Sequence, residues 1–383
     1  MGHVVVLGSI NMDVSIECDR VPHEGETING SNLLMSPGGK GANQAVAAAR
    51  AGACVQMIGA VGSDAFGSVL CESLAQAGVA TQLIAATPGS SGVAVVLRSH
   101  QNNRIIIEHG ANYALDETRA LRDLNATLTP HDVLLIQFEC SKSLVEASIT
   151  AAHAKGCRVI VNPSPARSMS RELMAACDVL CLNETECEQL FGITPTIDEH
   201  GTCPEARALQ EVAKRICATA PAEDGAGGAC GVAQDGGVVQ DGAAVQDGAS
   251  EQNTLSSSPC SLLVTLGAVG SMRVTPQNVM YQPSFAVHVQ DTTAAGDTFV
   301  GYLAACLAAD MPFAQAQLRA SYAAALATTK VGAQLSIPTK QEVEAYFRPK
   351  EVQCRISSNT SMSTQTHCQA DKPAHAQAQA RVY

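Results

Sequence analysis

The stretch VLLIQF, residues 133–138, is a continuous apolar run, and RVIVN at 158–162 is a second one. Such runs are typical of strands that helices cover on both faces of a parallel sheet. A helical pattern at 143–155 lies between the two runs. Strand, helix and strand in this order predict a βαβ unit.

The same alternation continues in both directions along the chain. We expect strands at 3–9, 55–61, 132–137, 157–161, 178–182 and 261–266. We expect helices at 42–51, 65–77, 143–155, 205–218, 297–309 and 313–331. The fold class that this alternation predicts is α/β, with a mostly parallel sheet flanked by helices.

Two stretches depart from the alternation and predict a small β-strand lid. Residues 12–34 contain VSIEC, in which apolar and polar side chains alternate. Residues 92–108 have the pattern of a hairpin with Asn102 and Asn103 at its turn. We expect half-exposed antiparallel strands beside the main sheet.

Two further segments have the composition of disordered chain. Residues 219–259 repeat a short unit of Gly, Ala, Gln and Asp, and residues 349–383 are rich in Ser, Thr, Gln and Ala. Such segments cannot bury enough apolar surface to offset the entropy of ordering. We predict a disordered insertion at 219–259, a disordered tail at 349–383 and one folded domain over 1–348.

Composition limits the classes of function. The chain has 383 residues, of which 46% are hydrophobic and 3% aromatic, and a net charge of −12. An acidic chain with few aromatic residues lacks the features of a nucleic-acid binder, so a small-molecule substrate is expected. The 15 cysteines form no C-x-x-C pair and indicate buried free thiols in a reducing compartment.

The N-terminal strand pattern leaves no room for a signal peptide, and no apolar stretch is long enough to span a membrane. We therefore expect a soluble intracellular protein, in the cytoplasm or nucleus, that binds no membrane.

Two N-terminal motifs carry polar groups after a strand or a turn. In GSINMD, 8–13, Asn11 and Asp13 follow the first strand, where α/β proteins place ligand-binding groups. In SPGGKGANQAVAAAR, 36–50, glycines precede Lys40 and Asn43 at a helix start. Each motif by itself also fits a plain turn, so both interpretations stay open.

Two motifs in the second half are equally ambiguous. Asn183 and Glu186 in LNETE have the spacing of a capping box, and the same spacing can hold a hydrated Mg²⁺. In TLGAVG, 265–270, Gly267 and Gly270 either form a turn or admit a nucleotide close to the backbone.

The stretch DTTAAGDTF, 291–299, joins a small-residue turn to a helix. Free N–H groups at such a turn attract an anion. Asp297 either caps the helix, worth about 1 kcal/mol, or acts as the base of a phosphoryl transfer, worth at least about 10²-fold in rate.

Together, GGKGANQA, NETE and DTTAAGDTF resemble the signatures of the ribokinase (PfkB) family of carbohydrate kinases. The resemblance covers residues 1–218 and 260–347. It implies a Rossmann-like α/β domain with a β lid, and ATP-dependent phosphorylation of D-ribose at its 5-hydroxyl, with Mg²⁺ and an activating K⁺. The alternatives are a kinase of another sugar or nucleoside in the same family, or a non-catalytic sugar-binding regulator. It also implies a homodimer in which lid strands pair.

The resemblance also assigns roles to residues of this chain. It implies that Asp297 is the catalytic base and that Ala294, Ala295 and Gly296 form the anion hole. The implied sugar contacts are Asn11, Met12, Asp13, Gly39, Lys40, Gly41, Ala42, Asn43 and Glu139. The implied nucleotide contacts are Asn183, Thr265, Leu266, Gly267, Ala268, Val269, Gly270, Gly296, Asp297 and Ser321. The implied K⁺ loop contains Asp291, Thr293, Ala327, Lys330, Gly332 and Ser336, and Glu186 is associated with Mg²⁺ through water.

Three positions depart from the family pattern. Ala294 stands where many members have glycine, and we expect it to adopt a right-handed turn conformation. Ser321 replaces a larger polar residue beside the adenine, and Leu335 replaces a frequent proline near the K⁺ loop.

Overall fold

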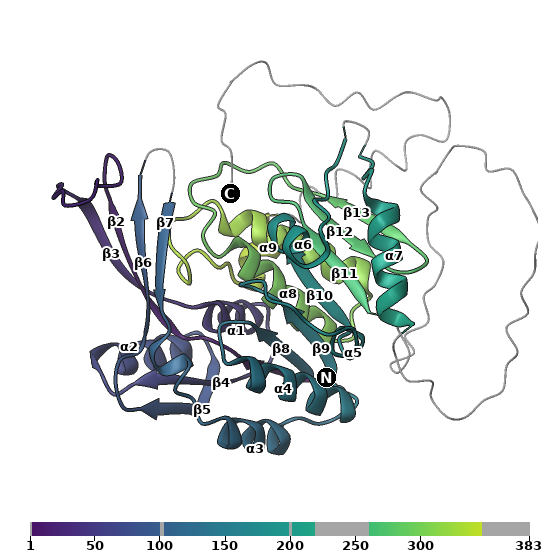
Figure 1. The fold of residues 1–383 in the computed structure, drawn as a ribbon, viewed down its shortest axis with the longest axis horizontal. Coiled ribbons are helices and arrows are strands. Elements are labelled where there is room, and N and C mark those ends of the chain that lie inside the picture. Colours follow the sequence, from purple (N-terminus) through teal and green to yellow (C-terminus); the bar gives the residue numbers. More distant parts are fainter. Residues whose placement is uncertain (1, 100–102, 199–200, 219–259, 347–383) are drawn as a thin grey trace, which may run out of the picture. The chain divides into compact units, whose positions relative to one another are not determined.

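The computed structural model describes residues 2–99, 103–198, 201–218 and 260–346. The predicted insertion and tail lie outside these described residues. The chain divides into two units, Met1–Lys340 and Gln341–Tyr383. Both sheets and all the labelled helices belong to the first unit (Figure 1).

The main sheet has nine strands in the order β13-β12-β11-β10-β9-β8-β1-β4-β5. The seven strands from β11 to β5 run parallel, and β12 and β13 extend the sheet as antiparallel strands. Their bounds are Val4–Leu7 (β1), Val55–Gly62 (β4), Val79–Thr87 (β5), Val133–Gln137 (β8), Arg158–Asn162 (β9), Val179–Asn183 (β10), Ser261–Thr265 (β11), Gly270–Val274 (β12) and Val279–Pro283 (β13). The six predicted strands are confirmed to within two residues. Strands β5, β12 and β13 were missed, because polar side chains interrupt the apolar residues of each.

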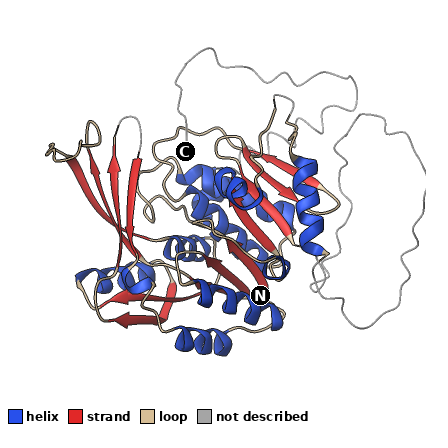
Figure 2. Ribbon diagram, in the orientation of Figure 1, coloured by secondary structure: helices blue, strands red, loops and turns tan. Residues whose placement is uncertain are grey.

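Helices cover both faces of this sheet (Figure 2). One layer contains α1 (Lys40–Arg50), α2 (Ala65–Gln76), α8 (Ala295–Ala308) and α9 (Phe313–Ala327). The other contains α3 (Glu117–Thr127), α4 (Lys142–Ala154), α5 (Arg171–Ala175), α6 (Glu184–Phe191) and α7 (Ala206–Cys217). The predicted α/β architecture is therefore confirmed.

Local chemistry explains where the helices begin and end. Asp64 and Ser141 accept hydrogen bonds from backbone N–H groups three residues on, at the starts of α2 and α4. Helix α9 ends four residues earlier than predicted, because the N–H groups of Thr329 and Lys330 bond three residues back and tighten the chain into turns.

The lid is a separate sheet of four strands in the order β3-β2-β6-β7. Its strands are Asn11–Glu17 (β2), Ser31–Gly38 (β3), Gly92–Arg98 (β6) and Asn103–Glu108 (β7). The predicted lid is confirmed, but its strands are not all antiparallel. Within each hairpin they are, whereas β2 and β6 pair in parallel. Strand β2 follows β1 and strand β6 follows β5, and β1 and β5 are parallel strands of the main sheet. Both lid strands therefore leave the carboxyl edge of the main sheet in the same direction (Figure 1).

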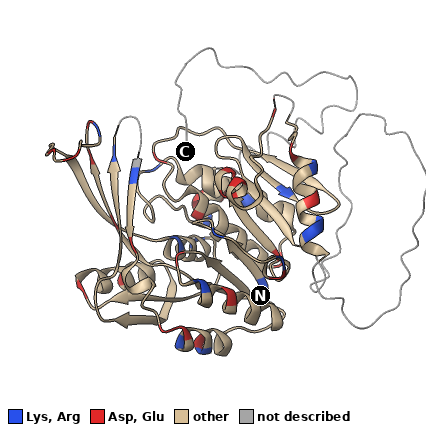
Figure 3. Ribbon diagram, viewed as in Figure 1, with Lys and Arg blue, Asp and Glu red and all other residues tan. Residues whose placement is uncertain are grey.

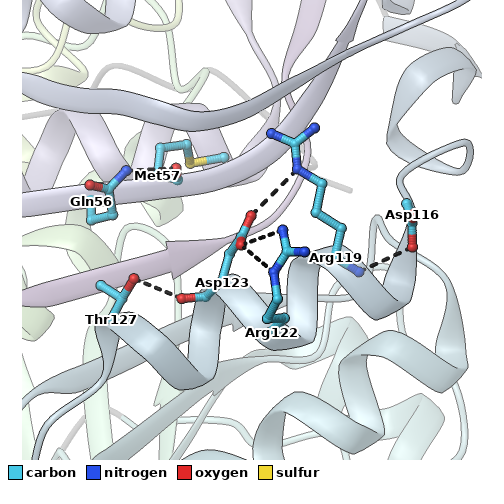
Figure 4. A network of polar contacts seen from close by, with 7 residues as sticks. All are labelled: Gln56, Met57, Asp116, Arg119, Arg122, Asp123 and Thr127. Carbon is cyan, nitrogen blue, oxygen red and sulfur yellow. Dashed lines mark hydrogen bonds and ion pairs between the residues drawn. The ribbon is translucent and has the colours of Figure 1, made fainter.

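Helices α3 and α7 carry charges of both signs. Figure 3 shows acidic and basic residues interspersed along α3 and α7. On α3, Asp123 forms ion pairs with Arg119 and Arg122 (Figure 4). No helix within the described ranges is both long and apolar enough to cross a bilayer. The cysteines in these ranges are free and mostly buried, although Cys54 is exposed.

Candidate active site

The candidate site lies where the parallel strands of the main sheet end. Gln137 and Asn162 are register partners at the ends of β8 and β9, and Asn183 and Thr265 are partners at the ends of β10 and β11. Glu139 follows β8 by two residues. Because carboxyl ends of parallel strands share one edge, polar side chains from distant parts of the sequence meet there.

The start of α1 reaches this edge because Gly39 and Gly41 have no Cβ atoms. Gly39 has φ +90°, and a Cβ there would lie 2.7 Å from the Asn11 nitrogen. A Cβ on Gly41 would lie 2.6 Å from the carbonyl carbon of Gly8. The glycines therefore let the start of α1 pack on the segment that follows β1.

Asn11 is buried and its amide has a fixed orientation. Asn112 donates from Nδ2 to Asn11 Oδ1 at 2.7 Å. Asn112 is itself fixed, because its Oδ1 accepts from the Ile10 N–H at 2.9 Å. This arrangement leaves Asn11 Nδ2 as the group that can donate to a ligand hydroxyl.

Asp297 lies in the first turn of α8 but does not cap it. The N-cap residue is Ala294, which makes no side-chain cap bond. Both carboxylate oxygens of Asp297 instead accept from amides on α1: Oδ2 from Asn43 Nδ2 and Oδ1 from Gln44 Nε2, each at 3.0 Å. The structure therefore does not support the cap interpretation and leaves the carboxylate for chemistry.

Three carboxylates and one lysine determine the electrostatics of the site. Burial raises the pKa of Asp297 above its ordinary value, although Lys40 and the two amides lower it. Burial also raises the pKa of Asp13 to about 7, with further contributions from Glu139 and Asp297. Burial by itself lowers the pKa of Lys40, but the surrounding carboxylates shift it above its ordinary value. Lys40 is therefore a permanent positive charge among these acids.

Glu139 is held at the same place. It is buried, and its Oε2 accepts from Ser9 Oγ and, at 3.4 Å, from the Lys40 N–H. Asn43 also has its Oδ1 buried with no hydrogen-bond partner among the described residues. A buried acceptor of this kind is costly unless a ligand or a water satisfies it, so Asn43 Oδ1 is available to a ligand hydroxyl.

Two positions of the sugar-contact set are different in character. Met12 and Ala42 have their side chains in the hydrophobic core. The Ala42 N–H bonds to the Ser9 carbonyl at 2.9 Å. These two side chains pack in the core beneath the site.

The turn before Asp297 has a conformation that the sequence analysis did not anticipate. Ala294 has φ 59° and ψ 11°, which is left-handed, and the prediction of a right-handed turn is wrong. The left-handed residue reverses the chain directly before the helix, so the N–H groups of its first turn point out of the helix end. Gly296 and Asp297 lie in that turn, where an anion binds favourably.

The expected nucleotide residues form the turn between β11 and β12. The Leu266 N–H bonds to the Gly270 carbonyl at 2.8 Å, and Gly267 has φ +51°. Val269 is exposed in this turn. Ser321, on α9, uses its hydroxyl to bond the Gln317 carbonyl of its own helix.

Asn183 and Glu186 form the capping box that their spacing allows. Asn183 Oδ1 accepts from the Glu186 N–H at 2.7 Å, and Glu186 Oε2 accepts from the Asn183 N–H at 3.0 Å. The cap prediction is confirmed, and it leaves one Glu186 oxygen for a water-mediated contact. Within the described ranges, no three His, Cys, Asp or Glu side chains cluster as direct metal ligands.

The segments of the expected K⁺ loop come together. Asp291 accepts from the Thr293 N–H at 2.9 Å and from the Gly332 N–H at 3.0 Å. The Gln290 and Asp291 N–H groups bond the Thr328 carbonyl. Ser336 is fully buried beside this loop in sequence, and Ala327 and Lys330 close the turn after α9.

A cavity of about 700 Å³ separates the lid from this loop. Its walls include Glu17, Leu34 and Arg98 from the lid and Asp291 and Val331 from the loop region. It does not include Asp297, so we regard it as the open space beneath the lid rather than as the reaction centre.

Five residues of the site were missed from the sequence: Ser9, Gln44, Asn112, Gln137 and Asn162. Gln137 and Asn162 had a signal, since each is a polar residue that ends an otherwise apolar strand. Gln44 and Asn112 had none, because an amide in a helix or turn fits a solvated position equally well.

A half-buried carboxylate held by amides at a helix N-terminus, beside a permanent cation, is suited to the transfer of an anionic group to a hydroxyl. The chain belongs to the pfkB family of carbohydrate kinases, whose family model matches residues 1–220 and 204–340.

Individual relatives agree with this assignment. The chain is similar to the ribokinase of Haemophilus influenzae, with 35% identity over 88% of this chain and 96% of that protein. It is similar to the ribokinase of Bacillus subtilis, with 32% identity over 90% of this chain and 99% of the relative. Its fold is similar to that of Arabidopsis thaliana ribokinase complexed with ribose and ATP, with a TM-score of 0.69, 28% identity and coverage of 90% and 98%.

Proposed function

We propose that this carbohydrate kinase transfers the γ-phosphoryl group of ATP to the 5-hydroxyl of D-ribose, giving D-ribose 5-phosphate and ADP. The proposal rests on the orientation of Asp297 in the first turn of α8. Asn43 and Gln44, both on α1, each donate a hydrogen bond to one of its two carboxylate oxygens. The ribokinases among its relatives and the ribose and ATP complex of the Arabidopsis protein support the choice of substrates.

The residues of the site have distinct parts in this reaction. Asn11, Asp13 and Glu139 orient the sugar by its other hydroxyls. Asp297 accepts the proton of the attacking hydroxyl, and its raised pKa makes it a stronger base than an ordinary aspartate. The N–H groups of the 294–296 turn stabilise the charge on the transferring phosphoryl group.

Magnesium and potassium fit the donor groups that the structure provides. The remaining oxygen of Glu186 could hold a water of an ATP-bound Mg²⁺, and that ion would neutralise phosphate charge. The Asp291 loop and the turn after α9 supply the oxygens for K⁺, which would order the adjoining anion hole. We expect activity to require both ions.

The lid exposes large apolar side chains on its two edge strands. Leu33, Ile105 and Ile106 are more than 60% exposed, and β3 and β7 are both edge strands. Exposed apolar edge strands favour pairing with another chain. We propose a homodimer through the lids, in which Ile106→Lys yields a monomer by sedimentation.

A substrate panel tests the reaction. ADP release is measured for D-ribose, 2-deoxy-D-ribose, D-fructose and adenosine with ATP, Mg²⁺ and K⁺. We expect ribose to give the highest kcat/KM, and Asp297→Ala to lower it by at least about 10²-fold. Asp123→Ala, on the outer face of α3, is the matched control and should retain wild-type activity. Preference for another substrate would contradict the choice of ribose, and full activity in Asp297→Ala would contradict the choice of base.

A further inference from the structure

Gln44 is a second amide on Asp297, and its contacts leave it one orientation. Its Nε2 lies 3.0 Å from Asp297 Oδ1 and 3.1 Å from Asn162 Oδ1. A primary amide nitrogen has two hydrogens, so each of these acceptors receives one. The Gln44 oxygen is therefore on the opposite side, where it accepts from Gln137 Nε2 at 2.5 Å.

Of the two residues behind Gln44, Asn162 is held by a hydrogen bond and Gln137 by packing, since Gln137 Oε1 has no hydrogen-bond partner among the described residues. Asn162 donates from Nδ2 to the Cys181 carbonyl at 2.9 Å, so it presents Oδ1 to Gln44. The Gln137 side chain lies against Gly8, where a Cβ would come within 1.9 Å of Gln137 Oε1. Gln44 and Gln137 are both fully buried. Solvent cannot replace their hydrogen bonds, so the orientation of each amide depends on the others.

Helix packing brings this network onto Asp297. Gln44 is in the second turn of α1, and α8 contacts α1 through Gly301. A Cβ on Gly301 would lie 2.4 Å from the Gln44 carbonyl oxygen and 2.5 Å from Ala47 Cβ. The two helices therefore approach closely enough for a glutamine side chain to reach the first turn of α8.

We propose that Gln44, aligned by Gln137 and Asn162, is a positioning residue that holds the carboxylate plane of Asp297 in the orientation for proton acceptance. This inference rests on the role of Asp297 in the proposed function. Gln44 acts through Asp297 and is not itself a catalytic residue.

The role has an electrostatic consequence that simple packing lacks. The Gln44 N–H lowers the pKa of Asp297, as do Lys40 and Asn43, whereas Glu139 raises it. Asp13 also interacts electrostatically with Asp297. Loss of the Gln44 donor therefore makes Asp297 harder to ionise, and the acid limb of the rate profile moves to higher pH.

The test compares three methionine variants, since methionine keeps the length of glutamine without its hydrogen bonds. Gln44→Met is expected to lower kcat by roughly 10- to 100-fold with little change in the KM of the sugar, and to move the acid limb up by roughly one pH unit. Gln137→Met is expected to lower kcat and raise the acid limb as well, but by less than Gln44→Met. Gln56→Met is the matched control, because Gln56 is a glutamine on β4 that bonds only backbone carbonyls, one of them that of Met57 (Figure 4). It should leave kcat and the pH profile unchanged.

Two outcomes would overturn the inference. One is a Gln44→Met enzyme with the kcat and acid limb of the wild type. The other is a Gln44→Met/Gln137→Met enzyme whose loss is the product of the single losses, because residues of one network are non-additive. If Gln44→Met fails to fold, Asn162→Ala replaces it, and an unchanged kcat and acid limb in that variant would equally overturn the inference.

The measurements use whichever sugar the wild type phosphorylates fastest and are expressed relative to the wild type. A wild type that prefers another sugar therefore contradicts only the proposed substrate, whereas the variants test the role of Gln44.

Discussion

Replacing Asp13 by asparagine is expected to stabilise the protein at alkaline pH. Asp13 is half-buried on β2, and burial, Glu139 and Asp297 raise its pKa from 3.8 to about 7. A carboxyl group whose pKa is raised in the folded state contributes stability below pH 3.8 that is lost as the pH rises through 7. Asparagine carries no charge, so the variant does not lose this contribution.

The size of the effect follows from the change in pKa. A shift of roughly three units at about 1.4 kcal/mol per unit sets an upper limit of about 4 kcal/mol. Because the side chain is partly exposed, solvent screening reduces this value, and we expect about 2 kcal/mol. The difference between variant and wild type should grow between pH 4 and pH 8.

Urea unfolding without ligand, at pH 4, 6 and 8, measures this difference. Asp123→Asn, an aspartate in exposed ion pairs on α3, is the control and should show a small difference at every pH. Sugar phosphorylation by Asp13→Asn should fall even as the protein becomes more stable. A variant that is less stable than the wild type at pH 8, or a difference that does not change with pH, would refute the electrostatic account of the site.

Three further predictions concern residues around the site. Asp64→Ala should lower the free energy of unfolding by about 2 kcal/mol in urea, because Asp64 both caps α2 and accepts from the N–H and hydroxyl of Ser91; an unchanged midpoint would contradict this role. Ala294→Gly should keep stability within about 1 kcal/mol, since relief of the left-handed conformation and the greater freedom of the unfolded chain offset each other, whereas Ala294→Pro cannot adopt φ 59° and should abolish phosphorylation. Asn112→Leu should raise the KM of the sugar about tenfold and leave that of ATP unchanged, because Asn112 orients Asn11; equal effects on both KM values would indicate general unfolding instead.

Much of the fold was determined by local sequence patterns. The apolar runs at 133–138 and 158–162 become β8 and β9, since a strand covered on both faces needs apolar side chains at every position. The stretches in which apolar and polar residues alternate become lid strands, because one face of the lid stays exposed and needs no apolar side chains. The spacing of Asn183 and Glu186 determined the capping box, which needs only residues three positions apart.

Tertiary structure decided the features that depend on distant residues or on backbone conformation. Asn43 and Asp297 are 254 positions apart, and only the packing of α1 on α8 brings them to 3.0 Å. The parallel pairing of β2 and β6 depends on the edge from which both strands leave the main sheet. By itself the sequence could name Asp297 as a cap or a base, because both fit the first turn of a helix. The structure argues against the cap, because Ala294 is the N-cap residue, no side chain caps the helix, and both Asp297 oxygens accept from amides of α1.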